Sequence, residues 1–341
     1  SNLPNTKFLN SLNRTPQKGP PIWFMRQAGR YHDHYQALKK NHSFEELCKK
    51  PLLAAETAMG PINEFDFDVA ILFSDILFPL EALGMDLSYA PGPQFGEHLN
   101  EDNASSLLTK KNPINFMDFQ GEAIERTLEM LPNEKSLIGF VGGPWTLIAY
   151  ACNINKDLRN INLNNFQSSL LEGVILPLLK ENIQLQLNAG AEIVMIFDSA
   201  AHQLSNGDLD IYLEKTFGAL TKEFPNKVGY YAKDGIDYDT IISKQIDQQV
   251  KLAGMGLDSN IDIRDYFKKT NHGFIQGNFN ERFLTLPHKE FLQKLESFIS
   301  HMSALESEER AGWVCGLGHG ILKTTPQENV KEFVLRIRES F

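Results

Sequence analysis

Short apolar segments recur along the chain, and an amphipathic stretch follows most of them. Eight of these segments, bounded by glycine or polar residues and often rich in β-branched or aromatic side chains, predict β-strands at residues 22–25, 69–73, 137–141, 193–197, 228–232, 254–257, 273–275 and 312–315. The sixth and seventh are diluted by glycine and are inferred from their spacing. Apolar residues at intervals of three and four predict helices at residues 44–59, 116–130, 166–187, 241–252, 291–304 and 328–341.

The alternation of strands and helices predicts the fold class. It implies parallel strands joined by right-handed crossovers, and continuous apolar runs are typical of strands covered on both faces. Eight units favour an α/β fold, a single closed (β/α)8 barrel, with one domain over residues 1–341. The stretch 86–115 is longer and more polar than a barrel loop, so we expect it to form an excursion on the surface.

Charge and cysteine content narrow the functional classes. With 33 basic and 43 acidic residues the net charge is −10, which argues against a general affinity for nucleic acid or anionic membranes. An anionic ligand must therefore meet a local cluster of positive charge. The scattered Cys48, Cys152 and Cys315 form no disulfide framework and favour a reducing cytoplasm. The polar first twenty residues and the lack of a long apolar run predict neither a secretory signal nor a membrane span.

Polar residues follow every predicted strand, at the carboxyl ends where a barrel builds its active site. Arg26 follows the first segment and Arg30 comes four residues later, and two planar guanidinium groups suit carboxylate or phosphate groups of a ligand. An internal salt bridge is the alternative. Asp75 ends the second segment, so its carboxylate is partly desolvated and needs a donor or a cation. Pairing with Arg26 or Arg30 would be a purely structural explanation.

His319 lies in a glycine-rich turn, residues 316–320, which permits close approach of the backbone to a ligand. A histidine that only caps the loop is the alternative. A role in turns or helix caps is the simpler interpretation for three other polar residues after strands, Asp234, Asp258 and Asn278. The triplet His32-Asp33-His34, or Cys315 with His319, supplies no complete set of metal ligands. Dinucleotide and Walker A motifs are absent from the sequence.

One segment resembles the signature of a known family. Residues 23–31 read WFMRQAGRY, which is similar to the MRQAGRY motif that follows an apolar strand in the uroporphyrinogen decarboxylase family. Similar segments follow in the order of that family: FSDIL at 73–77, ALGM at 82–85, GPWTL at 143–147, AKDG at 232–235 and LGHG at 317–320. The resemblance spans nearly the whole chain.

The resemblance implies a cofactor-independent homodimeric barrel that removes carbon dioxide from the four acetate side chains of uroporphyrinogen. The product is coproporphyrinogen, in haem biosynthesis. Arg26 and Arg30 would then bind substrate carboxylates, and an ionised Asp75 would accept pyrrole N–H hydrogen bonds and stabilise positive charge on the ring during catalysis. The protonated pyrrole would be the electron sink, so that neither a metal nor an organic cofactor is needed.

By the same resemblance, Tyr150 and Ser199 match residues that contact the substrate, and His319 matches a histidine near the propionates. Packing at the barrel rim is the alternative for all three. The chain departs from the family pattern at Asn153-Ile154, at residues 200–202, at residues 278–280 and at Gly316. Two other functions remain open: a corrinoid-linked methyltransferase of the same superfamily, which would need zinc held by Cys and His, and a non-enzymatic anion-binding barrel.

Overall fold

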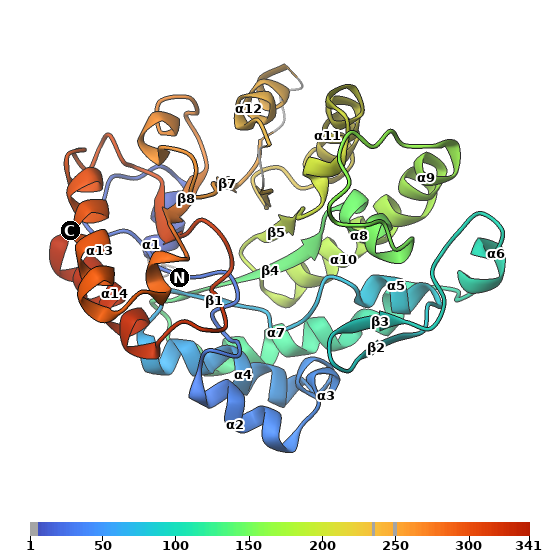
Figure 1. Cartoon of the computed structure of the whole chain (residues 1–341), viewed down its shortest axis with the longest axis horizontal. Helices are drawn as coiled ribbons and strands as arrows, with labels where there is room; N and C mark the ends of the chain where they lie inside the picture. Colours follow the sequence, from blue (N-terminus) through green and yellow to red (C-terminus); the bar gives the residue numbers. More distant parts are fainter. Residues whose placement is uncertain (1–5, 234–235, 248–250) are drawn as a thin grey trace.

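A curled parallel β-sheet forms the centre of the molecule, and helices surround it (Figure 1). The computed structural model describes residues 6–233, 236–247 and 251–341. Seven strands pair in the order β1-β4-β5-β6-β7-β8-β9, namely β1 (Val69–Ile71), β4 (Ser136–Gly142), β5 (Val194–Phe197), β6 (Val228–Tyr231), β7 (Gly254–Gly256), β8 (Phe274–Phe279) and β9 (Trp313–Leu317). A separate antiparallel hairpin joins β2 (Leu87–Tyr89) to β3 (Pro93–Phe95). The predicted α/β class with parallel strands is confirmed.

The α-helices of the described residues surround the sheet, and most of them lie between successive strands in the chain. They are α1 (Lys7–Leu12), α2 (Asp33–Asn41), α3 (Phe44–Lys49), α4 (Pro51–Phe65), α5 (Phe78–Leu83), α6 (Ala104–Leu107), α7 (Asp118–Met130), α8 (Pro144–Ala151), α9 (Asn165–Leu170), α10 (Leu176–Ala189), α11 (Asn206–Leu220), α12 (Tyr238–Asp247), α13 (His288–Ser303) and α14 (Gln327–Ser340). In Figure 1, α4 and α7 lie together along the lower side of the sheet, and α13 and α14 lie near the C-terminus.

The first predicted strand is the one that the structure does not assign as a strand. Ile22 makes an isolated parallel bridge to β9, and its carbonyl accepts a hydrogen bond of 2.9 Å from the amide of Asp68, just before β1. Beyond Ile22, the amide of Phe24 donates to Oε1 of Gln27 at 3.1 Å, and Nε2 of Gln27 donates to the carbonyl of Val69 at 2.9 Å. Toward β1 a side-chain amide thus replaces the backbone ladder beyond Ile22, while backbone hydrogen bonds join the segment to Cys315 of β9. The other seven strand predictions are confirmed.

Two clusters of buried apolar residues cover the two faces of the sheet, as the continuous apolar runs predicted. The inner cluster draws side chains from or beside all seven strands, including Val69, Ile138 and Phe274. Helix α1 covers the end where the strands begin, because Phe8 packs 5.6 Å from the ring of Phe274 and Ser11 donates to the carbonyl at the start of β9. The opposite end, at the carboxyl ends of the strands, is left for a cavity.

Two helix predictions change in the structure. The predicted helix 44–59 is two helices, because Pro51 begins α4 and holds Lys50 in an extended conformation. The predicted helix 166–187 is α9, a π-helical turn at Leu171–Ile175 and α10, with Pro177 in the first turn of α10. Helix α12 begins at Tyr238, three residues before the predicted region 241–252, and ends at Asp247; residues 248–250 of that region lie outside the described residues.

The stretch 86–115 is only partly the surface excursion that the sequence predicted. It contains the β2–β3 hairpin, α6 and a short 3-10 turn, Pro113–Met117. Leu87 and Leu99 are buried, with 6% and 3% of their surface exposed, because they pack against the apolar core. Leu87 therefore anchors the hairpin to the core, while most of the other residues of its two strands remain exposed or half-buried.

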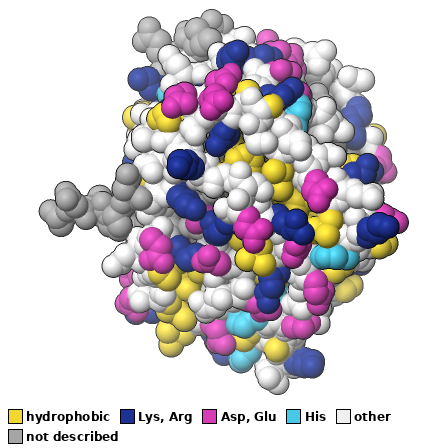
Figure 2. All heavy atoms as spheres, turned by 90° about the vertical axis from the view of Figure 1, so that its left-hand side faces the viewer, with side chains coloured by type: hydrophobic (Ala, Val, Ile, Leu, Met, Phe, Trp, Pro, Cys, Tyr) yellow, Lys and Arg dark blue, Asp and Glu magenta, His cyan; other side chains and the backbone are white. Residues whose placement is uncertain are grey.

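The surface carries mixed charge. Figure 2 shows basic and acidic side chains interspersed on the face that lies at the left of Figure 1. None of the described helices combines the length and apolar character that a bilayer crossing requires.

Candidate active site

A cavity of about 630 Å³ lies at the carboxyl ends of the strands. This volume is within the usual range for small-molecule sites. Much of its lining comes from the segments that follow Ile22, β1, β5, β6 and β9 in the chain, and the rest comes from helices, the β2–β3 hairpin and residues within the strands, β4 among them. All six residues that the sequence singled out line this one cavity: Arg26, Arg30, Asp75, Tyr150, Ser199 and His319. Their common placement is the pattern expected of residues that bind one ligand.

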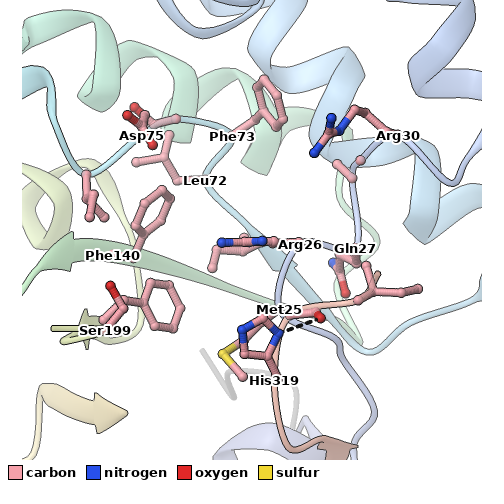
Figure 3. Close-up of a pocket in the computed structure, with 18 of the residues that line it drawn as sticks. Met25, Arg26, Gln27, Arg30, Leu72, Phe73, Asp75, Phe140, Ser199 and His319 are labelled. Atoms are coloured by element: carbon pink, nitrogen blue, oxygen red, sulfur yellow. Dashed lines mark hydrogen bonds between the residues drawn. The ribbon is translucent and has the colours of Figure 1, made fainter. Parts of the chain in front are cut away.

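Arg26 and Arg30 bring unpaired positive charge to the cavity. No ion pair joins either guanidinium to another described residue, so the internal salt bridge considered above is not formed. Arg26 has a left-handed backbone, with φ of 65°, a conformation that costs about 1–3 kcal/mol and is typical of functional sites. A Cβ at Gly320 would lie 2.8 Å from Cδ of Arg26, so glycine there makes room for this side chain. In Figure 3, Arg26 reaches toward the middle of the labelled side chains.

Asp75 is held by hydrogen bonds rather than by an arginine. The hydroxyl of Tyr89 donates to its Oδ2, and the backbone amides of Ile76 and Leu77 also donate to the carboxylate. Burial raises the pKa of Asp75, and these hydrogen bonds together with the charge of Arg26 oppose the rise. The purely structural explanation, an ion pair with Arg26 or Arg30, is therefore not what the structure has.

Three more predicted residues complete the lining. Tyr150 on α8 is 43% exposed, and burial of its hydroxyl together with the charge of Asp75 raises its pKa, so it keeps its proton. Ser199 follows β5. The Nδ1 atom of His319 lies 3.0 Å from the carbonyl oxygen of Gly320 (Figure 3), and because a carbonyl only accepts, Nδ1 carries a proton.

The charge in the cavity is strongly biased. Four cationic side chains line it, Arg26, Arg30, Lys233 and Lys323, against the single carboxylate of Asp75 among the described lining residues. The local cluster of positive charge that the overall charge of −10 demanded is therefore present. Aromatic side chains of Phe73, Phe140 and Phe197 add apolar wall, so the cavity suits a ligand that combines carboxylates with flat apolar rings.

Sequence reasoning missed part of the site. Lys323 lies beyond the glycine-rich turn with no motif to mark it, and Phe140 lies inside a strand, where an apolar residue is ordinary. Lys233 was visible as a polar residue after a strand but was given no role. Tyr89 comes from the hairpin in the stretch 86–115, which the sequence placed on the surface.

A second strand-end aspartate has a different environment. Asp198, which follows β5, is completely buried and does not line the cavity. It accepts hydrogen bonds from Oγ1 of Thr146 at 2.7 Å and from the hydroxyls of Tyr212 and Tyr230 at 2.7 and 2.6 Å. A Cβ at Gly143 would lie 1.9 Å from its Oδ1, so the chain approaches this carboxylate as closely as glycine allows.

The other candidates have structural places. Asp258 accepts a hydrogen bond from the amide of Asn260, as expected of a turn residue. Asn278 is not a turn or cap residue, because β8 continues through it, and its side chain donates to the backbone carbonyls of Asp258 and Ile261. Asp234 and Gly235 lie outside the described residues. The buried His32 pairs with Glu64 at 2.6 Å, and the described residues contain no cluster of three or more His, Cys, Asp or Glu that could hold a metal. Cys315 packs in the apolar core rather than beside His319.

Fold and site together define an α/β protein with a cationic cavity at the strand ends, in which Asp75 is the one carboxylate among the described lining residues. Residues 3–340 match the family described as Uroporphyrinogen decarboxylase (URO-D). A protein named uroporphyrinogen decarboxylase from Orientia tsutsugamushi (strain Ikeda) is 32% identical, over 98% of both chains. Another of that name, from Trichlorobacter lovleyi, is 33% identical over 97% of both. The chain belongs to the uroporphyrinogen decarboxylase family, as the sequence resemblance indicated.

Solved structures with the same fold are more distant in sequence. A methyltransferase from Methanosarcina mazei superposes with a TM-score of 0.73 at 17% identity, covering 98% of this chain and 97% of the other. A putative vitamin-B12 independent methionine synthase from Listeria monocytogenes gives 0.54 at 10% identity, over 95% of this chain and 97% of the other. At these identities the likeness concerns the fold alone.

Proposed function

We propose that this chain is a carboxy-lyase that removes carbon dioxide from the four acetate side chains of uroporphyrinogen III and gives coproporphyrinogen III. Its family supports this activity, and so does one observation above all: the arginines of the signature and Asp75 converge in one cavity. The substrate is a flexible tetrapyrrole ringed by carboxylates, with pyrrole N–H groups at its centre. A cationic cavity with one central acceptor is complementary to both features.

Binding rests on the cationic side chains of the lining. Arg26 and Arg30 offer planar forks that donate two parallel hydrogen bonds to a carboxylate, and neither forms an ion pair with another described residue that would have to break first. Tyr150 and Ser199 donate from their hydroxyls to the remaining carboxylates, and His319 lies beside them in the cavity lining. These contacts orient one acetate at a time for reaction.

In the chemical step, Asp75 accepts the pyrrole N–H hydrogen bonds and stabilises the ring when it becomes a cation. A proton adds to a pyrrole carbon, and the electron pair of the bond between the methylene and the carboxylate moves into the ring. Carbon dioxide leaves, the resulting exocyclic methylene takes up a proton, and the ring carbon loses its own. One carboxylate is thus exchanged for hydrogen. Because the ring accepts the electrons, no cofactor is required.

The proposal extends to the closure of the sheet, the domain organisation, the oligomeric state and the cellular location of the chain. The segment around Ile22 acts as the eighth strand and closes the sheet into a (β/α)8 barrel, which hydrogen bonds on both of its sides support. The whole chain is one domain, it forms a symmetric homodimer that shelters the cavity mouth, and it works in the cytoplasm. Sedimentation at micromolar concentration tests the dimer, because particles of 38.6 kDa alone would contradict it.

The activity is tested by incubating the protein with chemically reduced uroporphyrin under anaerobic conditions. The products are re-oxidised and identified by mass. We expect successive losses of carbon dioxide that end at the tetracarboxylic product, with and without prior exhaustive chelation. Unchanged substrate would overturn the proposal, and turnover restored only by zinc would instead favour the methyltransferase-like chemistry.

A further inference from the structure

A tyrosine from the β2–β3 hairpin approaches the central carboxylate from behind. Tyr89 does not line the cavity, yet its hydroxyl donates to Oδ2 of Asp75, which does. The two residues are fourteen positions apart in sequence and belong to different elements. The hairpin therefore reaches the cavity in two ways: Pro93 of β3 lines it, and Tyr89 of β2 contacts Asp75 through a hydrogen bond.

Tyr89 is itself held on three sides. Its backbone amide donates to Oε1 of Glu45 on α3 at 2.9 Å, and its ring lies with its centroid 4.8 Å from that of Phe44 and 5.8 Å from that of Phe78. With the ring fixed between two helices, the hydroxyl has little freedom of direction. Burial and the nearby Asp75 charge raise the pKa of Tyr89, so the hydroxyl keeps its proton and remains a donor.

The adjoining Ser74 is braced from the opposite direction. Its Oγ accepts a hydrogen bond of 3.0 Å from Nε2 of Gln120 on α7, and Oε1 of Gln120 accepts from Asn182 on α10 at 2.7 Å. Buried, fully connected polar networks of this kind fix one geometry. The backbone before Asp75 is thus fixed by helices, and Tyr89 is the side-chain donor that holds the carboxylate, beside the backbone amides of Ile76 and Leu77.

We propose that Tyr89 is a positioning residue for the decarboxylation: it holds the Asp75 carboxylate in the orientation that accepts the pyrrole N–H groups and keeps it ionised. This inference rests on the proposed function. Tyr89 acts through Asp75 and touches no substrate. A hydrogen bond to the charged form of an acid favours that form, so the hydroxyl works against the burial that drives Asp75 toward neutrality.

The pKa of Asp75 that a titration would measure depends on the charged and titratable groups that face its carboxylate. They are Tyr89 from the hairpin, Arg26 from the signature segment, Tyr150 from α8 and the buried Cys48 from α3. Arg26 favours the ionised form, whereas Tyr150 and Cys48 are neutral in the ordinary pH range because their pKa values are raised. Removing the Tyr89 hydroxyl therefore raises the pKa of Asp75 and leaves Arg26 as the opposing charge.

The test is Tyr89→Phe, which keeps the ring between Phe44 and Phe78 and removes only the hydroxyl. We expect kcat for uroporphyrinogen to fall about tenfold with KM changed less than about threefold, and the acidic limb of the pH profile to move about one unit upward. In an Asp75→Asn background, Tyr89→Phe should have no further effect on kcat. Tyr266→Phe, at a tyrosine outside the cavity lining, is the matched control and should behave as wild type.

The turnover of the wild-type protein is measured first, so that failure of the proposed function can be told apart from failure of this inference. A wild type without decarboxylation overturns the proposed function, and an active wild type matched by Tyr89→Phe in kcat and pH profile overturns this inference. A second readout needs no turnover: 13Cγ-aspartate NMR, with the Asp75 signal assigned from Asp75→Asn. The pKa of Asp75 should be higher in Tyr89→Phe than in wild type, and equal values would contradict the role of Tyr89.

Discussion

Asp75 and Asp198 look alike in the sequence and differ in the structure. Each follows a strand of the parallel sheet, each accepts a hydrogen bond from a tyrosine hydroxyl, and burial raises the pKa of each. Asp198 is sealed between α8, α11 and β6 by three hydroxyl donors. Asp75 lines a cavity that also holds Arg26.

The difference between the two environments shows when a carboxylate at the end of a strand can act on a ligand. Asp198 joins a helix–sheet interface and is inaccessible to a ligand, so its hydrogen bonds serve stability. Asp75 is held by one hydroxyl, lies near the positive charge of Arg26 and borders the cavity. A strand-end position is therefore insufficient as a functional signal, and the surroundings of the carboxylate decide its role.

The largest expected effect comes from Asp75→Asn, which keeps the shape and removes the charge. We expect kcat to fall by about two orders of magnitude or more, since charge that stabilises the ring cation is lost. The melting temperature should change by less than about 3 °C, because no ion pair is broken. Anaerobic initial rates and thermal unfolding measure both. A stable Asn variant with nearly wild-type turnover would contradict the catalytic role.

The next largest effect is expected for Arg26→Lys and Arg30→Lys, which change the two arginines of the cavity. Lysine keeps the charge and loses the planar fork, so kcat/KM should fall roughly ten- to a hundredfold in each variant. Arg282→Lys, at an exposed arginine outside the cavity lining, is the control. Wild-type kcat/KM in both cavity variants would remove the proposed carboxylate clamp.

Asp198→Asn should give the reverse pattern from Asp75→Asn. An amide cannot accept from all three hydroxyls, so the free energy of unfolding should drop by about 1–3 kcal/mol. The turnover per folded molecule should fall less than about fivefold. Urea unfolding combined with rates at matched folded fraction separates the two effects. Full stability with lost turnover would reverse the assignment of the two aspartates.

The smallest effect is expected at a third carboxylate, Glu192, at the opposite end of the sheet. Burial raises its pKa to about 7, against hydrogen bonding from Ser136 and the charge of Lys227. Between the usual pKa of 4.5 and about 7 the folded state binds more protons than the unfolded state, so stability falls as pH rises through this window. Glu192→Gln should be more stable than wild type at pH 8 by about 1–2 kcal/mol and similar near pH 4. The exposed Glu134→Gln is the control, and equal pH dependence in Glu192→Gln and wild type would contradict the shift.

Most of the fold and half of the site were predictable because local sequence carries them. Arg26, Arg30, Asp75 and His319 follow apolar strand segments, and their order matches the family motifs. Tyr150 and Ser199 were reached through the resemblance alone. Tyr89 and Lys323 were not predicted, because hairpin and loop residues reach the site through tertiary packing that leaves no periodic signal.

The fold errors have the same origin. The segment after Ile22 has the composition of a strand, but the Gln27 amide replaces its backbone partners, which only the folded chain reveals. The break between α3 and α4, by contrast, was visible in Pro51. The effect of Pro51 on the backbone could therefore have been predicted from the sequence. The hydrogen bonds by which the Gln27 side chain replaces backbone partners could not.

The most direct test of the central claim compares the two aspartates in one sample of wild-type protein. With 13Cγ-labelled aspartate, the signals of Asp75 and Asp198 are assigned from the two Asn variants and followed while coproporphyrinogen, the expected product, is added in reduced form. If Asp75 accepts the pyrrole N–H groups, its signal shifts on binding while that of Asp198 stays in place. A bound tetrapyrrole that leaves Asp75 unmoved, or moves both signals equally, would contradict the account.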